Sequence, residues 1–205
     1  MPNQMDEQDL QDRLSLIEHM IAEGRRTTAH WSWLSVLWGV TYFAAMAWSA
    51  WGPNKVWAWP ACVAAALVVM AVGLSGSRNK SQEKHPETTM GRAIGSVWMG
   101  LGISMVLLFL ALGFSGRLGD VHVFIAVVSS FLGLANGACG LMLRWKAQIA
   151  CAVLWWTTSV ASLFVSENQA VIMFLTAIFL CLIVFGFYGM VLEARERRQR
   201  GAVHA

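Results

Sequence analysis

Long apolar segments separated by short polar ones dominate the pattern of this 205-residue chain. Six stretches of 20 to 25 residues contain no Asp, Glu, Lys or Arg: 31–54, 56–77, 93–116, 121–143, 147–166 and 168–192. An α-helix of about 20 residues crosses the hydrocarbon core of a bilayer, which is roughly 30 Å thick. The pattern therefore predicts an all-α membrane protein, built as a bundle of six transmembrane helices.

Trimming these stretches at their polar ends gives the expected spans and divides the chain into three parts. The expected spans are about 31–51, 56–76, 93–115, 121–143, 147–166 and 169–192. Together they form a transmembrane domain over 31–192, preceded by a cytoplasmic N-terminal helix within 1–30 and followed by a basic cytoplasmic tail, 193–205. No proline falls in the interior of a span, so we expect mostly straight helices.

Residues 6–26 show a second periodicity, that of an amphipathic helix. Apolar side chains recur on one face at helical spacing: Leu10, Leu14, Ile17 and Ile21. The polar face is mostly acidic, whereas helices that lie on membranes are rich in Lys and Arg. The pattern favours pairing with a second copy, as a homodimer, or docking on a cytoplasmic protein partner. A solvated extension of the first span is the alternative.

The distribution of charge predicts the orientation in the membrane. Thirteen of the fifteen Lys and Arg residues fall in 1–30, 78–92, 144–146 and 193–205, and the other two are Lys55 and Arg117. Positively charged loops stay in the cytoplasm, so both termini are expected there, in a plasma membrane or bacterial inner membrane. The net charge of +3 is spread between spans instead of over one soluble face, so we expect no nucleic-acid partner.

Small residues suggest how the spans pack. In the third span, Gly91 and Gly95 form one four-residue step, and Ser96, Gly100 and Ser104 form a second ladder. The fourth span has a ladder with the same four-residue spacing: Ser129, Gly133 and Gly137. Such ladders let helix backbones approach closely. We therefore expect the third and fourth spans at the centre of the bundle.

One carboxamide, Asn136, lies well inside a span. Burying an amide in hydrocarbon without partners is costly, so it should face another helix. It could line a path for a substrate with Tyr42 and Tyr188, or it could simply bond helices together.

Residues that carry chemistry are scarce. The spans hold no charged side chain, and the four cysteines form no C-x-x-C pair. The G-x-S-G segment 113–116 resembles the serine motif of rhomboid intramembrane proteases, but the last span lacks the histidine that would act as base. Asp120 and His122 form a D-x-H pair at the outer end of the fourth span, and Glu167 lies on another short loop, which is a poor arrangement for a metal site. We expect no enzyme, no metal and no cofactor.

Two functions remain for a bundle of this kind. A non-catalytic regulatory, accessory or scaffolding role fits the lack of reactive groups, with the lipid bilayer as its environment. The alternative is a transporter or channel for a small neutral or hydrophobic molecule. A continuous polar cavity around Asn136 would favour transport, and a dry bundle would favour the first role.

Overall fold

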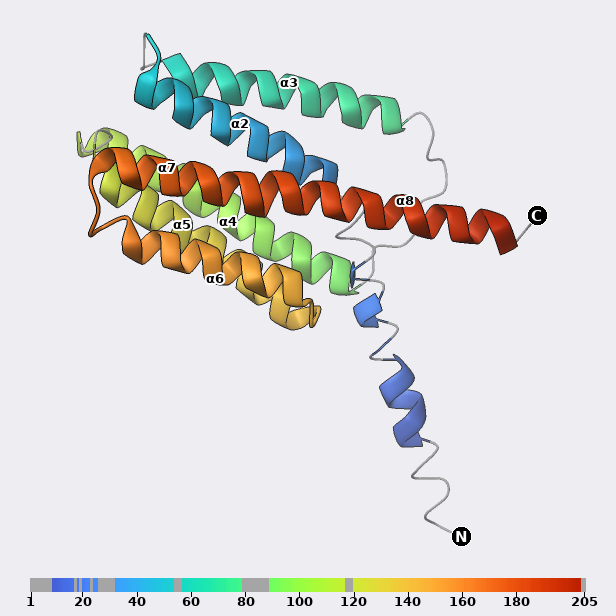
Figure 1. Ribbon diagram of the computed structural model, residues 1–205. Helices are drawn as coiled ribbons and strands as arrows, with labels where there is room; N and C mark the ends of the chain where they lie inside the picture. The colour runs from blue at the N-terminus through green and yellow to red at the C-terminus, as the bar shows by residue number, and fades with distance from the viewer. Residues whose placement is uncertain are drawn as a thin grey trace.

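The computed structural model describes residues 9–16, 18, 20–22, 24–25, 32–53, 57–78, 89–116 and 120–203. All regular secondary structure within these ranges is helical. From residue 32 onward the helices lie side by side and run along one common direction (Figure 1). The predicted all-α fold is confirmed for the described part of the chain.

One helical rod lies in each of the six charge-free stretches, and the last rod continues through the basic segment to Val203. They are α2 (Ser32–Trp51), α3 (Ala58–Arg78), α4 (Thr89–Phe114), α5 (Val121–Met142), α6 (Lys146–Ala161), α7 (Glu167–Ile178), the π-helical segment η2 (Phe179–Val184) and α8 (Phe185–Val203). The last three follow one another without a break and form one long rod (Figure 1). Each expected span therefore corresponds to one helical rod.

Among the described residues, three of these rods are long and apolar enough to cross a membrane. They are Met90–Phe114, Val121–Met142 and Glu167–Arg195, and Ala58–Gly73 forms a shorter apolar helix. The six spans were predicted from the absence of charged residues alone. That criterion is less strict than helix length and hydropathy taken together. Helix α6 has 16 residues and is about 24 Å long, short of the roughly 30 Å hydrocarbon core. Helix α2, with 20 residues, is not one of these three.

Helix α5 lies at the centre of the bundle and α4 at its edge. The buried share was compared over the most apolar 18 residues of each rod. It is 61% for the rod Val121–Met142, 50% for Glu167–Arg195 and 6% for Met90–Phe114. The prediction that the third span shares the central position is therefore wrong. The fourth span does occupy the centre.

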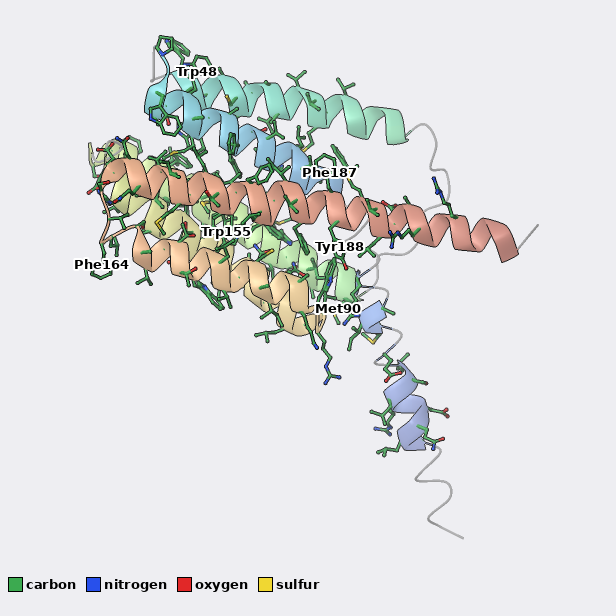
Figure 2. The ribbon with its side chains drawn as sticks, viewed as in Figure 1. Trp48, Met90, Trp155, Phe164, Phe187 and Tyr188 are labelled. Atoms are coloured by element: carbon green, nitrogen blue, oxygen red, sulfur yellow. The ribbon has the colours of Figure 1, made fainter. Side chains whose placement is uncertain are left out.

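Aromatic rings tie five of the helices together in the interior. Phe124 of α5 lies edge-on to Trp59 of α3 at 5.5 Å between ring centroids, and to Phe109 of α4 at 5.4 Å. It also meets Phe174 of α7 at 6.3 Å, and Phe174 meets Trp155 of α6 at 5.9 Å. Figure 2 shows Trp155 in the interior of the bundle, where it is fully buried. These distances suit the attraction between ring edges and faces.

The long C-terminal rod departs from the expectation of straight, regular helices at η2. The backbone N–H of Phe185 bonds to the carbonyl of Leu180, five residues back, where an α-helix would use the fourth. A π-turn of this kind inserts one extra residue into the helix, and such turns occur frequently at functional sites.

Candidate functional site

Asn136 lies on the buried face of α5. Its side chain is 3% exposed, and its Nδ2 donates to the Leu132 carbonyl of the same helix at 2.8 Å. This amide donor is therefore partnered without help from a neighbouring helix.

The two tyrosines that were expected near Asn136 lie elsewhere. Tyr42 stacks against Trp59, which contacts Phe124. Phe124 is twelve residues, or about 18 Å, from Asn136 along α5. Tyr188 is 47% exposed on α8 and lies toward the end of the bundle that holds Met90 (Figure 2). Within the described part of the chain, no hydrogen bond or ring contact joins these three polar side chains.

The small residues of the fourth span face α6. A Cβ built on Gly133 would lie 2.5 Å from Nε1 of Trp156, and one on Gly137 would lie 2.9 Å from Cη2 of the same indole. The Trp156 ring can lie this close to α5 because neither glycine has a side chain. Ser129, one turn away, is fully buried, and among the described residues its Oγ has no hydrogen-bond partner.

Two hydroxyl bonds also link α5 and α6. The Ser159 hydroxyl donates to the carbonyl of Ala126 at 2.7 Å, across the two helices. The Ser130 and Ser159 oxygens are 2.7 Å apart. Because Ser159 has one hydrogen and gives it to Ala126, Ser130 is the donor in the second bond.

The glycines of the third span do not pack against another helix in the described part of the chain. A Cβ built on Gly95 or on Gly100 meets no atom of the described residues within 4 Å, and Ser104 is half-buried. This corrects the expected packing role within one chain. Helix α4 instead contacts the bundle through larger apolar side chains, Ile94 near one end and Leu112 near the other.

The N-terminal segment is joined to the end of α5 by Arg25. Its guanidinium donates through Nε to the carbonyl of Leu143 and through a terminal nitrogen to that of Arg144, both at 2.9 Å. Gly24 is buried beside it, and a Cβ there would lie 2.6 Å from side-chain atoms of Leu143 and Met90. Residues 24 and 25 are thus fixed against α4 and α5.

The carbonyls that Arg25 binds lie where α5 ends. Arg144 adopts a positive φ of 49°. Its N–H bonds to the carbonyl of Leu141 at 3.2 Å, and that of Trp145 bonds to Gly140 at 2.9 Å. These two bonds form a Schellman motif, which closes a helix and leaves its last carbonyls pointing outward. A cation there also opposes the negative end of the helix dipole.

Beyond this junction, residues 9–16 form a helix that projects away from the bundle (Figure 1). Three leucines on it are strongly exposed: Leu10 at 62%, Leu14 at 55% and Leu16 at 61%. Arg13 forms a salt bridge with Asp9 at 3.0 Å, one turn earlier. Of the predicted 6–26 helix, residues 6–8, 17, 19, 23 and 26 lie outside the described residues.

At the opposite end of the bundle, the D-x-H pair has structural roles. The Asp120 carboxylate accepts the backbone N–H of Val123 at 3.2 Å and caps the N-terminus of α5. Nδ1 of His122 lies 2.7 Å from the carbonyl of Ser162, at the end of α6. Both side chains thus hold helix ends.

The structure also brings together two cysteines that sequence reasoning left unconnected. The Cys181 thiol of η2 donates to the carbonyl of Cys151 in α6, with 3.7 Å between sulfur and oxygen. The two cysteines are thirty residues apart and follow no spacing motif. Only the packing of α6 against η2 makes them neighbours.

Comparison of the chain with protein-family models, with curated proteins and with solved structures finds no match. The fold itself defines an all-helical protein with three helices of membrane-spanning length and composition in its described part. Any function must therefore be argued from the residues themselves.

Proposed function

We propose that this chain is a six-span protein of the plasma membrane or bacterial inner membrane with a non-catalytic regulatory, accessory or scaffolding role. In this proposal the N-terminal helix binds a cytoplasmic protein or a second copy of the chain. The bundle anchors that helix and responds to its engagement.

The observation that carries the proposal is the attachment of an exposed apolar helix to the most buried rod. Leu10 and Leu14 project into solvent, while Arg25 binds the carbonyls at the end of α5. Exposed leucines on one face of a helix are the usual anchors when a helix binds a groove or a partner helix. A partner that moves this helix would pull on the turn between α5 and α6.

The arrangement of charge supports six spans with both termini in the cytoplasm. Arg25 contacts Arg144, and Trp145 stacks on Phe185 of α8 at 5.0 Å between centroids. The N-terminal segment, the turn 144–146 and the start of α8 therefore lie at the same end of the bundle. A positive-inside arrangement requires these basic segments to lie on one side of the membrane. Reporter fusions at Ala205 and within residues 79–88 should both give a cytoplasmic signal. A periplasmic or extracellular signal from either position would contradict the six-span topology.

The filled interior supports the non-catalytic role over the alternative of a transporter or channel for a small neutral or hydrophobic molecule. Phe124, Phe174 and Trp155 occupy the centre, and Asn136 bonds to its own helix. A transport route would need polar groups facing a shared space, and the polar residues expected to form one lie apart.

Substitution of the exposed leucines tests the partner proposal. Leu10→Asp with Leu14→Asp should abolish chemical crosslinking of residues 1–26 to a partner or a second copy in native membranes. The matched control is Gln11→Asp with Ser15→Asp, which adds the same charge away from the apolar face. If both double variants crosslink like the wild-type chain, the helix is a solvated extension of the first span and the proposal fails.

A further inference from the structure

Two thiols meet inside the bundle, one from α6 and one from η2. The Cys181 thiol donates to the backbone carbonyl of Cys151, with 3.7 Å between sulfur and oxygen, which brings the two cysteines side by side. Both thiols are free. Cys139 lies in a separate cluster with Ile94 and Leu143, so it does not belong to this pair.

The contact depends on the π-helical turn. Cys181 is the third residue of η2, whose wider turn inserts one extra residue into the rod. One residue corresponds to about 100° of rotation in an α-helix. If η2 became α-helical, α8 would rotate by about 100° relative to α7. The contact between Cys151 and Cys181 therefore requires the π-turn.

The surroundings of the pair are apolar. Cys181 is 1% exposed and belongs to the main core with Ile178 and Leu182, while Cys151 is half-buried beside that core. Charged oxidants such as glutathione disulfide are excluded from hydrocarbon because burying their charges is costly. A disulfide carries no charge and no N–H or O–H group, so the oxidised pair also suits this environment.

We propose that Cys151 and Cys181 form a reversible disulfide, with a lipid-soluble quinone as the oxidant. Two S–H bonds break and one S–S bond forms. The two thiols are oxidised and together lose two electrons and two protons. The quinone takes up both electrons and both protons and is reduced to the hydroquinone.

The bond would link α6 covalently to the long C-terminal rod. In the oxidised state the π-turn is held in place, and with it the rotation of α8 relative to α7. In the reduced state the rod is free to change register. The redox state of the membrane thereby sets the orientation of α8 and of the basic residues on it.

The test uses the full chain in lipid nanodiscs. Decylubiquinone, a fully substituted quinone that does not readily alkylate thiols, is added to the reduced protein, and free thiols are then blocked with N-ethylmaleimide. Peptide mapping without reductant should recover a Cys151–Cys181 crosslink, with two fewer maleimide adducts per chain and a melting temperature a few degrees higher. Dithiothreitol should reverse all three changes.

Two controls make the test decisive. The variant with Cys62→Ser and Cys139→Ser keeps the pair and should lose the same two adducts, whereas Cys181→Ser should keep every adduct. Wild-type mapping needs no variant, so a poorly folded substitution cannot hide the answer. Crosslinking by copper–phenanthroline but not by the quinone would overturn the proposed oxidant. No crosslink with either reagent would overturn the pair.

Discussion

A methyl group added at Gly133 should separate α5 from α6. The Cβ of Gly133→Ala would overlap the five-membered ring of Trp156, lying 2.5 Å from Nε1 and 3.1 Å from Cγ. Cγ is the first ring atom of that side chain, so the indole cannot avoid the methyl group by a small movement of its far end. It must leave its place over Gly133 and Gly137, or the helices must move apart.

The size of the effect follows from two opposing contributions. Overpacking of this kind costs about 1–3 kcal/mol, and replacing a helical glycine by alanine returns up to about 1 kcal/mol. Gly100→Ala is the matched control, because no atom of the described residues lies within 4 Å of its Cβ and only the second contribution applies. The two variants should therefore differ by about 1–3 kcal/mol, or roughly 2–12 °C in melting temperature for a chain of this size.

Thermal unfolding in a mild detergent, with both variants beside the wild-type chain, measures the difference. The cause is isolated by repeating Gly133→Ala in a Trp156→Ala background, where the indole is gone and the extra cost should vanish. The packing argument is refuted if Gly133→Ala and Gly100→Ala melt together. It is equally refuted if the cost of the Gly133 substitution persists without the indole.

Two further predictions address the bonds that join separate parts of the chain. Arg25→Gln should raise hydrogen exchange in residues 9–25 several-fold, because the charge-assisted bonds to the end of α5 are lost; Arg13→Gln, which removes an exposed salt bridge, should leave exchange near Arg25 unchanged. Ser159→Ala should cost about 1–2 kcal/mol in thermal unfolding, since it removes both hydroxyl bonds between α5 and α6, whereas Thr157→Ala breaks bonds only within α6.

The positions of the helices could be predicted because charged residues lie near most of their ends, although α8 continues past Glu193 to Val203. Residues such as Lys146 and Glu167 begin helices α6 and α7 in the structure, as the charge-free stretches implied. Whether each rod crosses a membrane was harder to predict. Freedom from charge does not guarantee sufficient length, and α6 ends at Ala161 after 16 residues.

The packing of the rods could be predicted only in part. Gly100 and Gly133 belong to similar small-residue ladders. In the described part of the chain no atom lies within 4 Å of a Cβ on Gly100, whereas a Cβ on Gly133 meets a tryptophan. Their difference lies in what the neighbouring helix presents. Trp156 supplies a ring that needs a flat surface beneath it, and a sequence ladder contains no information about that partner. The Cys151–Cys181 contact was missed for the same reason, since it depends on the packing of two distant segments.

Arg25 illustrates how one residue can satisfy two requirements at once. In the proposed topology, Arg25 is one of the positive charges that would keep the N-terminus in the cytoplasm. In the structure, its fork of donors binds the carbonyls of Leu143 and Arg144. In the proposed topology both roles need a cation at the same membrane boundary, but only the second needs the planar geometry of a guanidinium. Arg25→Lys should therefore preserve topology while weakening the junction, which separates the role in insertion from the role in coupling.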